Sequence, residues 1–275
     1  MNEIELRVAL VAGAVVVVLG VLWLRSFLRA RRRAALLREP LPPEWRELLA
    51  ERVPLYRRMP EELRREMEPK VRAFLEDVRF VGCGGLEVTD EMRLVIAWQA
   101  CVLIARRDPG VYASLASVLV YPDEFVVEES EEDEAGVVTE GTRVLSGQTF
   151  DTDRIVLSWR DVCESSAPGD AYNVVLHEFA HYLDHTVGNA LSDASSRLRA
   201  LEEWHAVLER EYEALCSAVE RGEDTLIDPY GAEDPAEFFA VATETFFELP
   251  AEMEQRHPRL YVELQKFYGL DPARW

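Results

Sequence analysis

The chain has 275 residues, of which 48% are hydrophobic, enough for one large domain or two small domains with a substantial core. Its formal net charge is −21, and residues 73–275 contain 15 Lys and Arg against 41 Asp and Glu. An acidic body of this kind repels phosphate backbones, so we expect no nucleic-acid binding. The four cysteines form no Cys-x-x-Cys pair, so we expect neither a disulfide framework nor a cysteine zinc site.

The N-terminal region contains an uninterrupted apolar run of seventeen residues, Val8 to Leu24. This length is at the short end for a membrane-spanning helix, and Trp23 would lie at the membrane interface. A cleaved signal peptide is the competing interpretation, but the positive residues follow the run and no small-residue cleavage site comes after it. We therefore expect one transmembrane anchor over residues 1–25 and a basic juxtamembrane linker over 26–43.

Arginines predict the orientation of this anchor. Six of them lie just beyond the apolar run, whereas the N-terminal side is short and has Glu3 and Glu5. The positive-inside rule then places the N-terminus outside and the large domain in the cytoplasm. We expect a single-pass protein of the inner or plasma membrane, with its basic linker also in contact with anionic lipid headgroups.

The remaining residues, 44–275, are expected to form one α+β domain that is mainly helical and has a small β-sheet. Apolar residues with helical spacing are found at 45–52, 61–74, 90–105, 194–220 and 235–249. Segments rich in β-branched and aromatic residues predict strands at 79–81, 118–121, 125–127, 137–138, 144–145 and 155–157. The helix over 90–105 is apolar nearly all round, which places it in the core. An acidic run, Glu128 to Glu134, is expected to be a solvated hairpin tip without a function.

One segment, Asn173 to Asp184, contains the motif His-Glu-x-x-His within a largely apolar helical pattern, and Asp170 is expected to cap this helix. His177 and His181 are four residues apart, so they lie one turn apart on the same helix face. Two imidazoles there can chelate one Zn²⁺, and Glu178 can reach a water bound to it. Because unpaired buried polar groups are costly, a metal explains why an apolar helix carries these side chains.

A catalytic zinc needs three protein ligands and an open position for water. The spacing leaves two candidates for the third ligand, Glu237 and Glu244, which lie seven residues apart on one face of the expected helix over 235–249. We expect zinc to lower the pKa of its water toward about 7 and to polarise a peptide carbonyl. Glu178 would take the proton of that water and pass it to the leaving amine. His185 continues the series of histidines, but a fourth protein ligand would block the water position.

Several blocks of the chain, in this order, resemble one known family. They are Gly85–Met92, Val120–Pro122, Val156–Trp159, His177–His181, Asp228–Ala232 and Asp234–Ala240. Through them, roughly Trp45 to Pro272 resembles the MtfA-type zinc peptidases (Mlc titration factor A, glucose-regulated metallopeptidases). This family is gluzincin-like and is similar to the catalytic domain of anthrax lethal factor.

The resemblance implies a zincin-like metallopeptidase domain with one zinc per chain. It implies that Glu237, not Glu244, is the third zinc ligand, and that Glu244 orients a ligand histidine. It also implies that Tyr230, seven residues before Glu237, stabilises the oxyanion of the reaction.

We therefore expect a membrane-anchored, cytoplasm-facing zinc peptidase that acts on peptides or proteins. Its metal ligands are His177, His181 and Glu237, and its catalytic residues are Glu178 and Tyr230. The alternative is a zinc-stabilised binding module that sequesters a transcriptional regulator and has little or no peptidase activity. The presence of Glu178 favours the enzyme, because a purely structural zinc site needs no general base.

Overall fold

The structure is a computed structural model that describes residues 39–123, 125–132, 138–145, 147–150, 153–165, 169–188 and 195–275, with short helical stretches between 19 and 35. It divides into two units, Met1–Pro40 and Leu41–Trp275. Most of the predicted membrane span, residues 8–18, lies outside the described residues. Within the described part of the chain, no helix is both long and apolar enough to cross a membrane.

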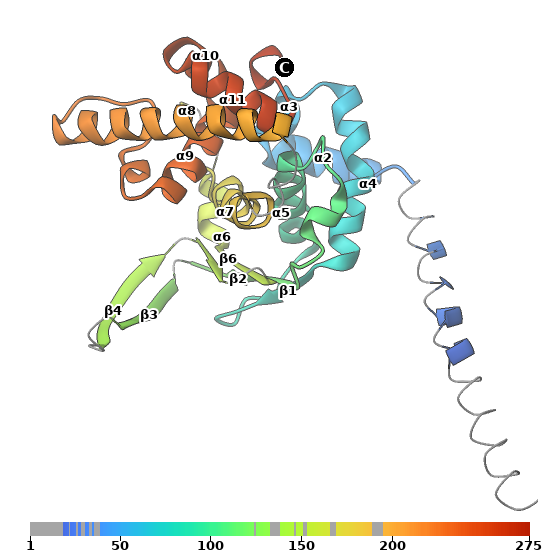
Figure 1. Ribbon diagram of the computed structural model, residues 1–275. Helices are drawn as coiled ribbons and strands as arrows, with labels where there is room; N and C mark the ends of the chain where they lie inside the picture. The colour runs from blue at the N-terminus through green and yellow to red at the C-terminus, as the bar shows by residue number, and fades with distance from the viewer. Residues whose placement is uncertain are drawn as a thin grey trace, which may run out of the picture. The chain divides into compact units, whose positions relative to one another are not determined.

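The second unit is organised around one apolar helix, α5 (Asp90–Leu103). Every residue from Leu94 to Leu103 is buried, as the apolar pattern predicted. Thr89 caps the helix, because its hydroxyl accepts a hydrogen bond from the Met92 N–H at 3.2 Å. Helix α5 lies between α4 (Glu61–Asp77) and α7 (Val174–Gly188), and it also packs against α2 (Pro43–Arg52) (Figure 1).

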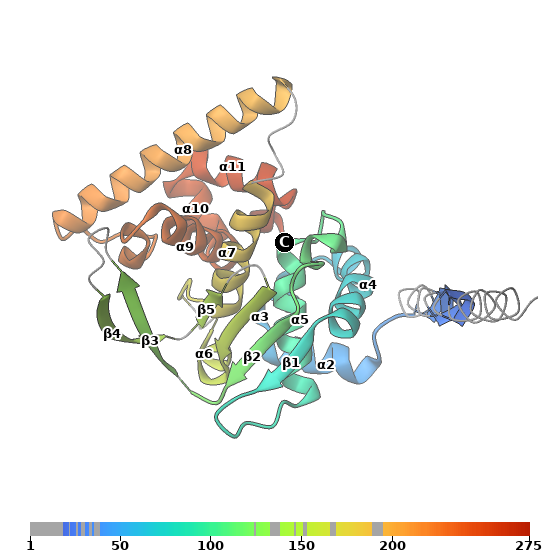
Figure 2. The same cartoon turned by 60° about the horizontal axis from the view of Figure 1, so that its bottom comes forward.

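A four-stranded sheet covers one side of these helices (Figure 2). Its strands are, in spatial order, β1 (Arg79–Gly82), β2 (Ser117–Tyr121), β6 (Arg154–Ser158) and β5 (Gly147–Phe150). The first three are parallel, and β5 is antiparallel to β6. Parallel neighbours need a long crossover connection, and α5 supplies it between β1 and β2. The register pairs buried Val118 with buried Ile155, so both contribute to the core under the helices.

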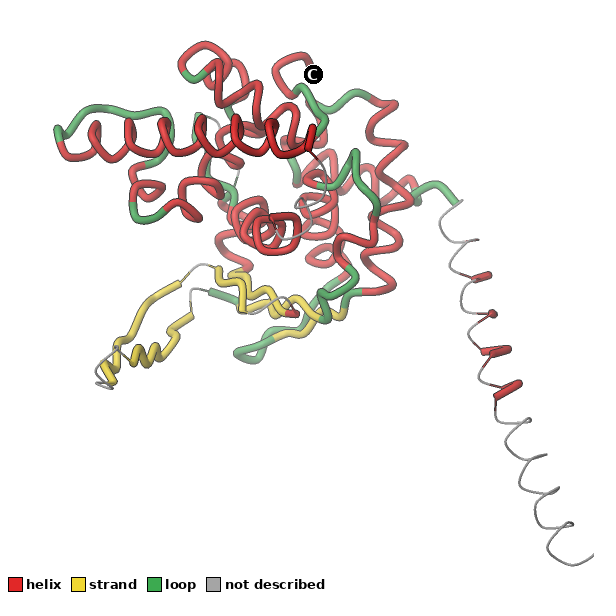
Figure 3. The backbone as a smooth tube through the Cα atoms, viewed as in Figure 1, coloured by secondary structure: helices red, strands yellow, loops and turns green. Residues whose placement is uncertain are grey.

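Two further strands, β3 (Phe125–Glu132) and β4 (Val138–Leu145), pair antiparallel in a separate sheet (Figure 3). The prediction of two short strands at 137–138 and 144–145 was wrong, because a single strand runs over 138–145. Strand β5 was not predicted. Part of the acidic run, Glu128–Glu132, lies within β3, and residues 133–137 are outside the described part. Cross-strand pairing, as between Glu128 and Thr142, extends these strands through polar residues that no local pattern marks.

From Trp159 to Trp275 the described residues form helices and loops, with no strand among them (Figure 3). Besides α7, these helices are α6 (Trp159–Glu164), α8 (Ser195–Glu220), the 3₁₀ helix η3 (Pro229–Ala232), α9 (Pro235–Glu248), α10 (Pro250–Arg256), α11 (Pro258–Tyr268) and the 3₁₀ helix η4 (Pro272–Arg274). Helix α8 packs on α11, where the rings of Trp204 and Phe267 stack with centroids 5.0 Å apart. The domain is thus α+β, mainly helical with a small sheet, as the sequence predicted.

Candidate metal centre

The motif helix α7 begins directly after Asn173, which caps it. The Asn173 side-chain oxygen accepts a hydrogen bond from the Leu176 N–H at 3.1 Å. The prediction that Asp170 caps this helix was wrong. Asp170 lies in the preceding loop, where its carboxylate accepts the Tyr172 N–H at 3.0 Å. Both residues can cap a helix, and the packing of Asn173 against other buried polar groups decides between them.

The second wall of the site is α9, which packs along α7. Asp234 caps α9 by accepting hydrogen bonds from the N–H groups of Ala236 and Glu237, at 2.7 and 2.9 Å, and Pro235 stands in the first turn. This cap agrees with the sequence prediction. It fixes Glu237 in the first turn of α9, and Glu244 follows two turns later on the same face.

The structure brings together His177, His181 and Glu237, which we call the ligand cluster. The two Nε2 atoms are 3.1 Å apart, and Glu237 Oε2 lies 3.0 Å from Nε2 of His177 and 3.4 Å from Nε2 of His181. Zinc–nitrogen and zinc–oxygen bonds of about 2.0–2.1 Å at tetrahedral angles put ligand atoms about 3.4 Å apart. The cluster therefore has the donor types and the spacing of three corners of a zinc tetrahedron.

The two imidazoles favour the ionised form of the Glu237 carboxylate. Its burial raises its pKa, but hydrogen bonds from His177 and His181 outweigh burial and hold the pKa well below its ordinary value. Glu237 is therefore ionised in the cluster. An ionised carboxylate and two imidazole nitrogens are a set of donors that a divalent cation such as Zn²⁺ binds.

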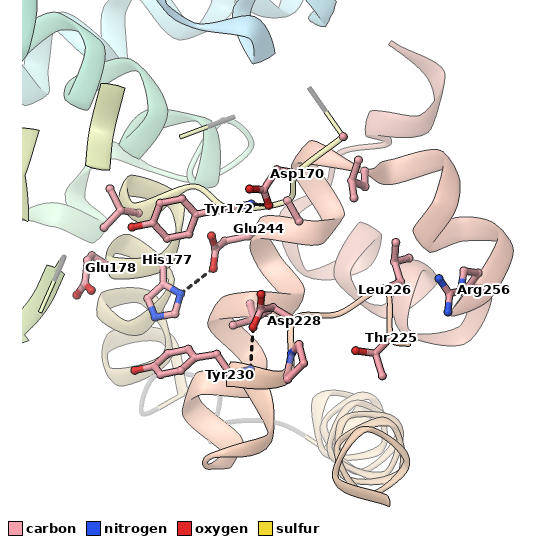
Figure 4. Close-up of a pocket in the computed structure, with 16 residues that line it drawn as sticks. Asp170, Tyr172, His177, Glu178, Thr225, Leu226, Asp228, Tyr230, Glu244 and Arg256 are labelled. Atoms are coloured by element: carbon pink, nitrogen blue, oxygen red, sulfur yellow. Dashed lines mark hydrogen bonds and ion pairs between the residues drawn. The ribbon is translucent and has the colours of Figure 1, made fainter. Parts of the chain in front are cut away.

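On the other side of its ring, His177 contacts a buried carboxylate. Its Nδ1 lies 2.7 Å from Oε1 of Glu244 (Figure 4). A carboxylate oxygen accepts, so Nδ1 carries a proton toward Glu244, and in the neutral form that a metal requires Nε2 is left to present its lone pair to the ligand cluster. Burial lowers the pKa of His177, yet the facing carboxylates of Glu244 and Glu237 raise it well above its ordinary value. For Glu244, burial is the largest effect and raises its pKa.

Glu244 belongs to a chain of polar groups, all buried except Arg58, that we call the support network: Glu244, Asn173, Gln99, Glu248 and Arg58. The Asn173 backbone N–H donates to Oε2 of Glu244, at 2.5 Å. Its side-chain amide donates to Gln99 and to Glu248, at 2.7 and 2.8 Å. Arg58, at the end of α3 (Pro54–Arg58), donates to the Glu248 carboxylate at 2.7 Å and to two carbonyls at the end of α9. The network links α3, α5, α7 and α9 behind His177.

A cavity of about 580 Å³ opens at the ligand cluster, and His177 and Glu178 form part of its wall. Glu178 is 5% exposed. Tyr172 and Tyr230 lie on opposite sides of the His177 ring (Figure 4). The Tyr230 ring is 6.0 Å from that of His177, measured between centroids, so the predicted catalytic residues do lie beside the cluster.

Tyr230 is held in place by η3. The Asp228 carboxylate accepts the Tyr230 N–H at 2.8 Å and begins this short helix. Gly231 is buried against α9, and a Cβ there would meet Leu215 and Phe238 at 3.3 and 3.4 Å. A larger residue would require Leu215 or the backbone of α9 to shift by a few tenths of an ångström, so glycine at this position allows the close packing of η3 that places Tyr230 at the cavity.

Comparison with known proteins agrees with this geometry. A family model described as glucose-regulated metallo-peptidase M90 matches residues 27–269. The chain belongs to this family. It is 36% identical over 223 residues to Mlc titration factor A of Pectobacterium atrosepticum, covering 80% of this chain and 84% of that one. The same protein of Escherichia coli O127:H6 is 32% identical over 233 residues, covering 84% of this chain and 87% of the other. An uncharacterized protein of Synechocystis is 38% identical over 246 residues, covering 88% and 89%.

The structure of this M90 chain also shows which of the candidate metal ligands that helical spacing left open lies in the ligand cluster. Of the two downstream carboxylates, Glu237 lies in the ligand cluster and Glu244 lies behind His177. His185 is exposed in the last turn of α7 and is outside the cluster. The residues that sequence reasoning missed are Gln99, Glu248 and Arg58. No local signal marks them, since each pairs with a partner that lies far away in the sequence.

Proposed function

We propose that this M90 chain is a zinc-dependent peptidase that hydrolyses peptide bonds in peptide or protein substrates. The observation that carries the proposal is the ligand cluster, whose three donor atoms lie 3.0–3.4 Å apart beside a cavity that Glu178 lines. Two histidines and one glutamate are a ligand set of catalytic zinc, and this set leaves the fourth position for water. Membership of a metallo-peptidase family supports the same reading.

Bound zinc would supply a Lewis acid that polarises the scissile carbonyl and acidifies water. The residues of the chain then move the protons. Glu178 accepts a proton from the attacking water as the water oxygen bonds to the carbonyl carbon, and it gives the proton to the amine nitrogen as the C–N bond breaks. Tyr230 donates a hydrogen bond to the oxyanion that forms between these two events.

The test is zinc content by elemental analysis and peptide hydrolysis, both on the full chain purified without added metal. We expect about one zinc per chain, and its loss in His177→Ala and Glu237→Ala. Glu178→Gln should keep the zinc and the unfolding temperature but lower hydrolysis by about 10²–10⁴-fold. The proposal is refuted if the purified chain contains no zinc that a chelator removes and added zinc restores. Unchanged hydrolysis in Glu178→Gln would refute the role of Glu178.

Tyr230→Phe gives a separate test of the oxyanion role. The ring and its position on η3 are kept, and only the hydroxyl is removed. We expect a decrease of kcat by about 10²-fold with little change in KM, as for removal of one oxyanion donor. Equal kcat values in Tyr230→Phe and the unchanged chain would remove Tyr230 from the mechanism.

A second candidate function follows from the name of the relatives, which describes a titration factor. In this candidate the domain sequesters a transcriptional regulator and zinc only stabilises it. The two candidates differ in one variant: Glu178→Gln should abolish hydrolysis yet leave capture of a regulator intact. The position of Glu178 in the cavity wall favours the peptidase.

For the location of the chain we propose a single N-terminal anchor over residues 1–25 in the inner or plasma membrane, with the catalytic domain in the cytoplasm. The apolar run bounded by arginines supports this proposal. Protease treatment of sealed inside-out and right-side-out vesicles tests it. Cleavage of the domain in right-side-out vesicles would overturn the orientation, and release of the chain by alkaline carbonate would overturn the anchor.

A further inference from the structure

The cavity extends well beyond the ligand cluster. Its far end is formed by Thr225, Leu226 and Leu249, with Arg256 from the last turn of α10. Figure 4 shows Arg256 at the end of the cavity away from Glu178, with Leu226 and Thr225 beside it. The hydrolytic mechanism uses no residue of this far end, so its composition bears on what the cavity accepts.

Charge is unevenly distributed along the cavity wall. Four acidic residues line it, and three of them are engaged by the protein: Asp170 and Asp228 accept backbone N–H groups, and Glu244 holds His177 and Asn173. The fourth, Glu178, is the proposed general base. Among the described residues that line the cavity, Arg256 is the one Lys or Arg.

The Arg256 guanidinium uses only one of its hydrogen-bond donors within the described residues. Its one hydrogen bond is from Nη2 to the Asp224 carbonyl, at 3.5 Å, and within the described residues it forms no ion pair. Several other arginines of the domain are paired with carboxylates, as Arg274 is with Glu254 and Arg58 is with Glu248. In a chain of net charge −21, an exposed cavity arginine without an acidic partner is a site for an anion from outside.

The neighbours of Arg256 define the kind of anion. A guanidinium presents its donors as a planar fork that fits a carboxylate with two parallel hydrogen bonds. Leu226 and Leu249 give apolar walls next to it, which suit the carbon atoms that carry a carboxylate in a peptide. The same cavity leads directly to Glu178 and His177, so the anion and the bond to be cut can belong to one molecule.

We propose that Arg256 is a carboxylate-binding subsite of the substrate cavity, and that substrates are peptides with a carboxylate at the residue that reaches the far end. This carboxylate is either the free C-terminus or the side chain of Asp or Glu. The proposal rests on the proposed function, because it takes the cavity to be the substrate site. Since Arg256 lies away from the bond to be cut, it contributes to KM more than to kcat.

The test measures binding without hydrolysis, using full-length Glu178→Gln and fluorescence anisotropy of dansyl-labelled pentaalanine. One pair of probes is the free acid and the C-terminal amide. A second set is amidated and has a single Glu or Gln at each position in turn. Each probe is measured with zinc-loaded and with EDTA-treated protein, in the Arg256→Gln variant and in the matched control Arg259→Gln, an exposed arginine of α11 that does not line the cavity.

We expect the carboxylate-bearing probe of a pair to bind about tenfold more tightly, the effect of one charge-assisted contact, and this preference to vanish in Arg256→Gln but persist in Arg259→Gln. A preference for acid over amide identifies the C-terminus as the source, and a preference for Glu over Gln identifies a side chain. The proposal is overturned if the acid and the amide bind equally or not at all and the Glu and Gln probes do the same. It is also overturned if a carboxylate preference persists in an Arg256→Gln variant whose unfolding temperature is unchanged.

The measurement separates this inference from the proposed function. If zinc and hydrolysis are absent but the Arg256-dependent preference is present in EDTA-treated protein, the peptidase proposal fails and the subsite stands. If zinc and hydrolysis are present but no carboxylate preference is found, the subsite fails and the peptidase stands.

Discussion

The two sides of the His177 ring differ in burial, composition and origin. The ligand cluster on the Nε2 side has side chains that are 12–18% exposed and comes from α7 and α9 alone. On the Nδ1 side the support network includes Asn173 at 0% and Gln99 and Glu244 at 3% exposure, and it draws on four helices. Only Arg58, at the far end of the network, reaches solvent, with a side chain that is 37% exposed. The comparison teaches that the three metal ligands stay partly accessible, while most of the groups that orient them are removed from water.

The difference in burial between the two sides has a different energetic cause on each side. A ligand site must exchange metal and water, so it cannot be closed, and its residues gain their stability from the metal. The support network gains its stability from complete pairing, because a buried polar group left without a partner costs about 1–3 kcal/mol and a charged one more. Changes to the cluster should therefore act on metal binding, and changes to the network on folding.

The largest expected effect is on the cluster side. His181→Ala should remove zinc from the purified chain entirely, because two remaining ligands do not make a catalytic site. The free energy of unfolding of the metal-free chain should change by less than about 1 kcal/mol, since the side chain is partly exposed. Elemental analysis and urea unfolding with EDTA measure the two quantities. The control is His205→Ala, an exposed histidine of α8, which should keep its zinc.

Asn173→Ala should have the largest effect on folding. It removes the cap of α7 and two amide hydrogen bonds, and it leaves Gln99 and Glu248 buried with fewer donors. We expect the free energy of unfolding of the metal-free chain to fall by about 3 kcal/mol. A loss smaller than that of His181→Ala would break the division between the two sides of the ring.

Arg58→Met tests the outer end of the network. It removes the charge partner of Glu248 and two hydrogen bonds to the carbonyls that end α9. Because Arg58 is partly exposed, we expect a smaller loss of unfolding free energy, about 2 kcal/mol, with zinc content unchanged. Its neighbour Arg57 is exposed and contacts one carbonyl, so Arg57→Met should stay within about 0.5 kcal/mol. Equal unfolding midpoints for the two variants would contradict the prediction.

Glu244→Gln sharpens the comparison, because Glu244 stands between the two sides. Both carboxylate oxygens of Glu244 accept a hydrogen bond, one from His177 and one from the Asn173 N–H. The amide of a glutamine has one accepting oxygen, so its NH₂ group would face one of these two donors. We expect the chain to fold and to bind zinc about tenfold more weakly. Competition against a chelating dye measures this affinity. An unchanged affinity would mean that Glu244 does not orient His177.

The accuracy of the sequence predictions follows the same division. The motif was readable because His177 and His181 are related by one helical turn, a purely local geometry. Asp234 was correctly assigned as a cap, since Asp before Pro at a helix start is a local signal. Asp170 was wrongly assigned as the cap of α7, because Asp and Asn can both cap a helix and only the packing of the Asn173 amide against Gln99 and Glu248 separates the two positions.

The support network could not be predicted from the sequence, because its partners are far apart along the chain. Gln99 lies 74 residues before its partner Asn173, and Arg58 lies 190 residues before its partner Glu248. Neither has a neighbour in sequence that would indicate a buried polar role. The same holds for β5 and for the continuous β4, whose hydrogen bonds come from a partner strand and not from their own apolar pattern.

The sequence by itself determined the motif helix, its apolar setting, the capped helix that carries Glu237, the core helix α5 and the mainly helical α+β class. These depend on interactions within a few residues along the chain. Helical spacing left Glu237 and Glu244 as alternatives that only the family resemblance separated, and tertiary structure decided that Glu237 joins the ligand cluster while Glu244 lies behind His177. Tertiary structure also decided that four helices share one polar network and that Arg256 ends the cavity. Those facts depend on which face of each helix meets which neighbour, and burial of polar groups permits only arrangements in which they find partners.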